Sequence, residues 1–342
     1  MRVVIDGIGI KAISAVVPKQ KRGYDDLAKI IGEKNAGRIC QNTGIDFVRV
    51  SKDGETAADY CEAAAKMVLT ETANIRGVVF VSQTPDYILP ATSCVLQHKL
   101  GLPADVVCYD VNSGCTGFIK GLHLASMLAS SMDGDVLLLV GDTMTKHVSP
   151  KDHSLFLLMG DAGSAVLVSP MKKSQMAFNF RTHGEGYKSL MIPAGGNRLL
   201  SSDATRQVVE CEKGNWRSKE HLYMDGMSIM LFALSKATSL IEEEIAALAY
   251  PPELYVFHQA NEFIVKSMAK NLKLDSDNVI LSVKDYGNTG PASIPLALCD
   301  TLPSHSHYTM KNVLLAGFGV GLTLATLITD LSNTKFHAVQ EI

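Results

Sequence analysis

The stretch Val106–Ala129, VVCYDVNSGCTGFIKGLHLASMLA, contains the pattern that decides the fold. Its first residues, Val106–Val111, are typical of a buried strand, the polar residues Asn112–Gly114 predict a tight turn, and an apolar helix is expected from about Thr116. Cys115 therefore falls at the N-terminus of a helix, where free backbone N–H groups and the helix dipole favour a thiolate over a thiol. The stretch alone leaves two interpretations open, a nucleophile or an inert buried cysteine.

Length and composition exclude several classes of protein. The chain has 342 residues, of which 46% are hydrophobic and 20% charged, and its formal net charge is −3. A chain of this size can bury a sizeable core, and without a basic excess no nucleic-acid partner is expected. Seven cysteines without regular spacing predict neither a disulfide framework nor a zinc site, which indicates a reducing, cytoplasmic setting.

The chain shows no pattern of a targeting or membrane-inserted segment. The N-terminus alternates like a strand and carries charges, so no signal peptide is expected. The longest uncharged stretch, Asn312–Thr329, is interrupted by three glycines and rich in β-branched residues. This pattern favours two buried strands joined by a glycine turn over a membrane span.

Apolar strands and helical segments alternate along the chain, which predicts an α/β protein with a mostly parallel, helix-covered sheet. Strands are expected at residues 2–17, Phe47–Ser51, Gly77–Ser82, Val106–Val111, Asp135–Val140, Ser164–Ser169, Leu254–Phe257, Val279–Val283 and Val313–Ala316. Helices are expected at Tyr24–Cys40, Thr56–Leu69, Ser93–Leu100, Asp225–Tyr250, Phe263–Leu272 and Ser293–Leu302. Residues 184–220 are rich in glycine and polar residues and predict a surface excursion.

An internal repeat relates the two halves of the chain. Three pairs of matching segments lie at one offset: Ser82–Thr84 with His258–Ala260, Cys115 with Asn288, and Asp142 with Gly319. An offset of roughly 175 residues that recurs three times indicates a duplication. We therefore expect two similar α/β halves, residues 1–175 and 176–342, packed as one compact unit with pseudo-twofold symmetry.

Three chemically distinctive residues, Cys115, His258 and Asn288, are predicted at the carboxyl ends of strands. Ligands of open α/β sheets bind there, so we expect the three side chains to meet near the centre of the molecule. Cys, His and Asn in this order are compatible with a cysteine protease or with acyl transfer through thioesters. The local sequence SGCTG and the mid-chain cysteine of a duplicated protein disfavour the protease.

Several motifs together resemble the thiolase superfamily, and within it β-ketoacyl-[acyl-carrier-protein] synthase III. They are QTPDYILPATSCVLQ, NSGCTGFIKGL, VFHQAN, DYGNTGPASIPLAL and GFGVGLTLA, in the family's order and over nearly the whole chain. The resemblance implies the thiolase-like fold, in which duplicated αβ halves form a five-layer αβαβα sandwich. It implies an acyltransferase of fatty acid biosynthesis and lipid metabolism, and a homodimer in which a loop near Pro85–Pro90 contributes across the interface.

The resemblance also implies what each site residue does. Cys115 would accept an acyl group from acyl-CoA or an acyl carrier protein, with the backbone N–H groups of Cys115 and Val320 as the oxyanion hole. His258 and Asn288 would stabilise the enolate that forms when a malonyl thioester loses CO2. The enolate would then attack the acyl-cysteine and release a β-ketoacyl thioester. No metal and no other cofactor is implied.

Substrate contacts depart from the family's usual pattern, so they are tentative. Where the family often holds the CoA adenine between Trp and Arg, this chain has Arg38 and His153, and the usual docking arginine reads Phe263, two residues after Asn261. The acyl group, its carrier and the pathway therefore stay open, including a specialised pathway of secondary-metabolite or surface-polymer synthesis. A non-condensing acyltransferase of the same fold and a catalytically silent partner subunit are the alternatives.

Overall fold

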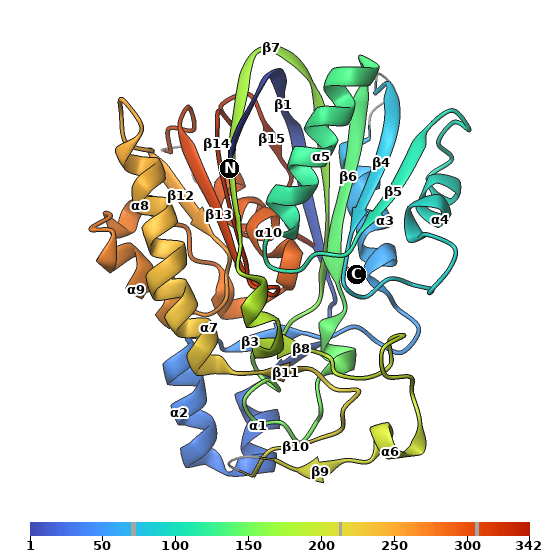
Figure 1. The fold of residues 1–342 in the computed structure, drawn as a ribbon, viewed down its shortest axis with the longest axis vertical. Coiled ribbons are helices and arrows are strands. Elements are labelled where there is room, and N and C mark those ends of the chain that lie inside the picture. Colours follow the sequence, from blue (N-terminus) through green and yellow to red (C-terminus); the bar gives the residue numbers. More distant parts are fainter. Residues whose placement is uncertain (70–72, 212–213, 305–307) are drawn as a thin grey trace.

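Two long strands organise the fold of the computed structural model, which describes residues 1–69, 73–211, 214–304 and 308–342. β1 (Arg2–Val17) and β7 (Ala162–Thr182) pair antiparallel over most of their lengths within a ten-stranded sheet. The first part of β7 pairs with β6 (Asp135–Asp142) and its last part with β14 (Thr323–Thr329), both antiparallel. The long strands thus link two arms of the sheet (Figure 1). The sheet is mixed, so the prediction of a mostly parallel sheet is wrong.

The outer strands of each arm pair in parallel. In the first arm, β4 (Ile75–Val81) lies between β6 and the edge strand β5 (Val107–Val111). In the second arm, β13 (Val313–Gly319) pairs antiparallel with β14 and parallel with β12 (Leu254–Phe257). The short strands β15 (Lys335–Phe336) and β16 (Gln340–Glu341) pair with β1. The expected boundary at residues 175 and 176 lies inside β7, and the division into halves stays a prediction.

Helices cover both outer faces of the arms and fill the space between them (Figure 1). The helices are α3 (Ala57–Val68) and α4 (Thr92–Lys99) on the first arm, α5 (Gly117–Met132) and α10 (Ser293–Thr301) in the middle, and α7 (Gly226–Phe232), α8 (Thr238–Ala246) and α9 (Glu262–Asn271) on the second arm. The central apolar cluster combines both middle helices with strands of both arms, and separate clusters lie under the outer helices. This layering confirms the predicted five-layer thiolase-like sandwich. None of the described helices is long and apolar enough to cross a membrane.

A smaller layer, which we call the cap, consists of residues 18–50, 184–211 and 214–225 and lies at one end of the sandwich (Figure 1, bottom). Its elements are β2 (Lys21–Gly23), α1 (Tyr24–Ile31), α2 (Glu33–Thr43), β3 (Phe47–Arg49), β8 (Leu190–Met191), α6 (Asp203–Arg206), β9 (Val209–Glu210), β10 (Trp216–Arg217) and β11 (Tyr223–Met224). Its core joins side chains such as Leu27 and Leu222 to Leu158 of the sandwich. The cap is therefore packed onto the sandwich rather than detached from it.

Two predicted helices differ from those in the structure because of local backbone geometry. The predicted helix Tyr24–Cys40 is two helices, separated at Gly32, whose φ of 80° ends the first. The predicted helix Asp225–Tyr250 contains a π-helical turn at Ala233–Ala237 and its last helical segment ends at Ala246.

Two predicted strands differ from the structure in their relation to the sheet. Val279–Val283 forms only one bridge, to Tyr255, because the side chain of Gln259 bonds the backbone of Ile280 and Ser282 where a ladder would otherwise form. β5 is an edge strand, and not the buried strand predicted from its apolar residues. Val279–Val283 is the segment that the predicted repeat pairs with β5, and because it forms no ladder, the second arm has no strand equivalent to β5.

Candidate active site

Cys115 lies between the end of β5 and the start of α5, and its side chain is 9% exposed. Strand β13 of the second arm passes directly beneath it. A Cβ added to Gly319 would lie 2.6 Å from the sulfur of Cys115, and the φ of Gly319 is 147°, so this position requires glycine. The nucleophile and the strand beneath it thus come from the two different arms of the sheet.

Burial controls the protonation state of Cys115. It raises the pKa of the thiol to about 11, and the nearby negative charge of Asp142 acts in the same direction. The backbone N–H groups of Val320 and Cys115 lower the pKa, as the predicted helix terminus requires, but desolvation outweighs them. The N–H groups at this terminus thus act in the predicted direction, but burial outweighs them and leaves the pKa of the Cys115 thiol raised.

The loop that carries Val320 is tied to the start of α5. The hydroxyl of Thr323 donates to the carbonyl oxygen of Val320 at 2.9 Å, and it lies 2.9 Å from the hydroxyl of Thr116, the N-cap residue of α5. These contacts hold the two predicted oxyanion-hole residues, Cys115 and Val320, in one unit.

His258 follows β12 directly and is almost completely buried. Its backbone N–H donates to Ala316 of β13, its ring Nδ1 lies 2.7 Å from the hydroxyl of Ser293, and the ring of Phe318 meets it edge-on. Burial lowers the pKa of the imidazole to about 3. His258 is therefore neutral at neutral pH and can act as a hydrogen-bond donor or acceptor.

Asn288 is placed by contacts with a distant loop. Its backbone N–H donates to the carbonyl oxygen of Leu158, and its own carbonyl oxygen accepts from Gly160. The side-chain Oδ1 accepts from the N–H of Gly290 at 3.0 Å. Because the oxygen is engaged, the Nδ2 group is the part of this amide that can donate to a ligand.

The structure brings the three predicted side chains together around two adjoining cavities. Cys115 and Asn288 line both, and His258 lines the smaller one, of about 130 Å³, together with Asn261 and Phe263. The larger cavity, of about 220 Å³, extends toward the cap. Its apolar walls come from Met144, Met159, Leu190, Met191, Ile192, Leu222 and Met224.

Arg38 and His153 do not line these inner cavities. They share a surface cavity of about 700 Å³ under α1 and α2. A further cavity, of about 380 Å³, lies between the surface cavity and the smaller inner cavity. It shares the lining residue Asn42 with the surface cavity and Phe263 with the smaller inner cavity. The cavities from Arg38 to Cys115 thus form a row in which each shares a lining residue with the next.

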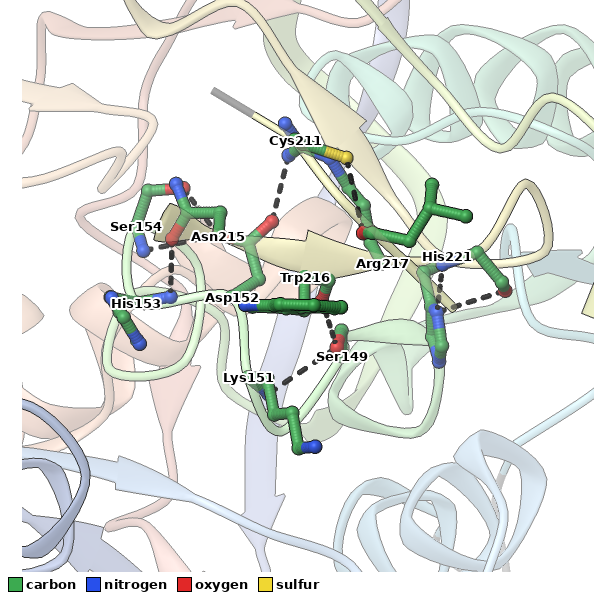
Figure 2. Close-up of polar contacts among 12 residues, drawn as sticks. Ser149, Lys151, Asp152, His153, Ser154, Cys211, Asn215, Trp216, Arg217 and His221 are labelled. Atoms are coloured by element: carbon green, nitrogen blue, oxygen red, sulfur yellow. Dashed lines mark hydrogen bonds and ion pairs between the residues drawn. The ribbon is translucent and has the colours of Figure 1, made fainter. Parts of the chain in front are cut away.

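The loop that carries His153 is fastened to the cap strand β10 (Figure 2). Asp152 forms a buried ion pair with Arg217 at 2.7 Å, and the backbone N–H of His153 donates to the side chain of Asn215. Lys151 lies over the ring of Trp216. Strand β10 belongs to the stretch that the sequence predicted only as a surface excursion. It therefore positions one wall of the surface cavity.

Sequence reasoning assigned Asn261 to substrate and missed three other polar residues. The side chain of Asn261 caps α9 by accepting from the N–H of Ile264, which is a structural contact. Ser293, Gln83 and Asp142 were missed, although Ser293 is in the same motif as Asn288 and Asp142 is in the repeat. Within the described residues, no group of three or more His, Cys, Asp or Glu side chains is arranged for a metal ion.

Two family models match the segments that carry these residues. The model of 3-oxoacyl-[acyl-carrier-protein (ACP)] synthase III matches residues 109–186, and the model of its C-terminal part matches residues 252–331. Cys115 lies in the first match, and His258 and Asn288 lie in the second.

Individual relatives match over nearly the whole chain. The β-ketoacyl-[acyl-carrier-protein] synthase III of Neisseria meningitidis serogroup C is 30% identical over 327 residues, which are 93% of this chain and 98% of that protein. A 3-oxoacyl-(acyl-carrier protein) synthase structure from Burkholderia xenovorans has a TM-score of 0.91 and 29% identity, and the match covers 100% of this chain and 99% of that one. A solved 3-oxoacyl-(acyl-carrier-protein) synthase III has a TM-score of 0.89 and 32% identity, with 94% and 99% covered. The chain therefore belongs to the β-ketoacyl-[acyl-carrier-protein] synthase III family of acyl-transferring condensing enzymes and has its thiolase-like fold.

Proposed function

We propose that the protein joins an acyl group to a malonyl thioester with loss of CO2 and releases a β-ketoacyl thioester. The observation that supports this most directly is that Cys115, His258 and Asn288 surround one cavity, although they come from three separate segments. A thiol nucleophile and two neutral hydrogen-bond donors are the groups that this chemistry needs.

In the first half-reaction the sulfur of Cys115 attacks the carbonyl carbon of an acyl thioester. The backbone N–H groups of Cys115 and Val320 hold the oxyanion, the bond to the leaving sulfur breaks, and the thiol proton leaves with it as a free thiol. Because the pKa of Cys115 is raised to about 11, little thiolate exists beforehand, so proton loss accompanies attack.

In the second half-reaction a malonyl thioester replaces the released thiol. Its bond to the carboxylate breaks, CO2 leaves, and the electron pair forms an enolate whose oxygen accepts hydrogen bonds from His258 and Asn288. The enolate carbon attacks the acyl-cysteine, the carbon–sulfur bond breaks, and the sulfur of Cys115 takes up a proton. Because the pKa of His258 is lowered, its imidazole is neutral near neutral pH and donates through its single N–H. No electron leaves the reactants, so the proposed chemistry requires no redox cofactor.

The row of cavities suits a long thioester arm that enters from the surface. Arg38 and His153 lie at its outer end, where a CoA nucleotide would bind. Lys270 lines the middle cavity and offers positive charge to phosphate or to an acidic carrier protein, whereas Lys266 there pairs with Glu262. We infer that acyl-CoA or an acyl carrier protein delivers both substrates by this route.

We also infer a homodimer that forms around β5. This strand lies at the edge of the sheet, and the nearby residues Tyr87, Ile88 and Leu89 are 58%, 99% and 80% exposed. An edge strand beside adjacent exposed apolar side chains is typical of an interface. Light scattering should give twice the mass of the chain, and Ile88→Asp should lower it, whereas a monomeric wild type would contradict the inference.

One mass-spectrometric experiment tests the reaction. The protein is incubated with an acyl-CoA, the mass of the intact chain is followed, and malonyl-CoA or malonyl carrier protein is then added. An adduct on Cys115 that disappears as β-ketoacyl thioester and CO2 form is expected, with Cys94→Ala active and Cys115→Ala inert. No adduct with any thioester would refute acyl transfer altogether. An adduct that yields no β-ketoacyl product would favour the non-condensing acyltransferase.

A further inference from the structure

Asp142 is a buried carboxyl group beside the nucleophile, and the proposed reaction does not use it. It ends β6, its side chain is 1% exposed, and it lines the larger cavity together with Cys115 and Asn112. Its charge raises the pKa of Cys115, which shows that the two groups interact. A carboxyl group in this place requires a reason, because burial of an ionisable group costs free energy.

One oxygen of this carboxyl group is fully engaged by the protein. Oδ1 accepts from the hydroxyl of Ser82 at 2.9 Å, from the backbone N–H of Gln83 at 2.7 Å and from the hydroxyl of Thr84 at 3.4 Å. All three donors follow β4 directly. They fix the plane of the carboxyl group and therefore the direction of the second oxygen.

The second oxygen, Oδ2, is buried and has no hydrogen-bond partner within the part of the chain that the structure describes. It faces Gly290, because a Cβ added there would lie 3.0 Å from it, and Gly290 lines the same cavity. Leaving such an atom unpaired costs free energy, and the cost is larger for a charged group. A ligand that offers a hydrogen bond at this wall of the cavity would recover that free energy.

We propose that Asp142 selects an acyl group that carries a hydroxyl on one of the first carbons beyond the thioester carbonyl. This inference rests on the proposed function, since it places the acyl chain in the larger cavity. Gln83, Asn112 and Asp142 make the wall near Cys115 polar, and the apolar side chains of the cap form the far wall. The substrate class is therefore a hydroxyacyl thioester whose remaining carbons are apolar.

A hydroxyl suits this site better than an ammonium group. An ammonium would bring a second charge into a buried place and lose its hydration. Burial also raises the pKa of Asp142 to about 7, so both forms of the carboxyl group are present near neutral pH. A hydroxyl serves both forms, because it can donate to the carboxylate and accept from the acid.

The test compares thioesters of equal length in single-turnover acylation of Cys115, followed by intact mass. The probes are butyryl-CoA, 2-hydroxybutyryl-CoA and 3-hydroxybutyryl-CoA. We expect the wild type to react with one hydroxybutyryl isomer at least about tenfold faster than with butyryl-CoA, the preference of one charge-assisted hydrogen bond. In Asp142→Ala this ratio should fall to about one.

Two further variants keep the result interpretable. Asp142→Asn preserves an oxygen for Ser82, Gln83 and Thr84, and it replaces the Ala variant if that variant does not fold. It should lower the ratio severalfold. Ser169→Ala removes another buried hydroxyl that has no partner in the described ranges and lies in β7, and it should leave the ratio unchanged. A wild-type ratio of one or less for both isomers, or an equal ratio in the Asp142 variants, would overturn the assignment. No acylation by any of the three probes would overturn the proposed function itself.

Discussion

The hydroxyl oxygen of Ser293 lies 2.7 Å from Nδ1 of His258, and both side chains are buried. The same oxygen accepts the backbone N–H of Gln259 at 3.4 Å. We expect this hydroxyl to donate its own proton to Nδ1, which would leave the proton of the neutral ring on Nε2. Ser293 would thereby select the tautomer that can donate to an enolate oxygen.

Ser293→Ala should slow decarboxylation about tenfold, because the ring loses the contact that holds its orientation and tautomer. Acylation of Cys115 should change much less. CO2 release and adduct formation measure the two steps, and ¹⁵N NMR of His258 reports the tautomer. Ser293→Thr retains the hydroxyl and should restore decarboxylation. Equal losses in both steps, or an unchanged NMR spectrum, would contradict the positioning role.

Gly319→Ala should abolish acylation without unfolding the protein. The added Cβ would lie 2.6 Å from the sulfur and 2.9 Å from the Cβ of Cys115, at a φ of 147° that other residues rarely adopt. A loss of about a hundredfold or more is expected in adduct formation, since a misplaced nucleophile loses its attack geometry. Gly196→Ala is the matched control, because nothing lies within 4 Å of its added Cβ. An active Gly319→Ala enzyme would show that the close approach is not required.

Alkylation of Cys115 by iodoacetamide should become about tenfold faster with each pH unit from 7 to 9, because only the thiolate reacts. The reason is that burial raises the pKa of Cys115 to about 11, so the thiolate fraction keeps growing throughout this range. Peptide mass spectrometry at fixed times gives the rate for this residue alone. A plateau below pH 8 would mean that the backbone N–H groups outweigh desolvation.

Asp142→Asn should change the pH dependence of stability. The pKa of Asp142 is about 7 in the folded protein, above its ordinary value of 3.8, so between these pH values the folded state holds a proton that the unfolded state has released. The free energy of unfolding therefore falls as the pH rises through this window, by up to about 1.4 kcal/mol per unit. Asn does not titrate, so the melting temperature of the variant minus that of the wild type should increase from pH 4 to pH 7. A constant or decreasing difference would contradict the raised pKa.

Arg217→Met should lower the free energy of unfolding by about 3–5 kcal/mol, because it leaves the carboxylate of Asp152 buried without its partner. It should also raise the KM for acyl-CoA, since the same loop carries His153 (Figure 2). Arg206→Met breaks the exposed pair with Asp203 and should cost less than about 1 kcal/mol. Chemical denaturation and steady-state kinetics measure both effects. Equal costs for the two variants would refute the importance of the buried pair.

Patterns that depend on neighbouring residues were predictable. The strand Leu254–Phe257 has the predicted bounds, and α5 begins one residue after the predicted start. Apolar periodicity and turn residues are local properties, so they can be recognised without the fold. The strand expected at Val279–Val283 could not be excluded in this way, because the side chain of Gln259 takes over its backbone partners from outside the segment.

The assembly of the site depended on contacts between distant residues. Asn288 is held by Leu158 and Gly160, and the ring of His258 is held by Ser293. The cap, which closes the larger cavity, was predicted only as a helix, a short strand and an irregular stretch, without any indication that these pack together. Contacts between residues far apart in the chain leave no periodic signal, so Ser293 and Asp142 were found only in the structure.

The amino-acid sequence by itself indicated most of the strands and helices of the sandwich, and the placement of a cysteine, a histidine and an asparagine after apolar or turn segments. Only the tertiary structure decided that Cys115 is a thiol, that His258 is neutral, and that Asp142 keeps one oxygen unpaired. The physical reason is that burial and close packing set these properties. Both arise from side chains that the fold brings together from opposite ends of the chain.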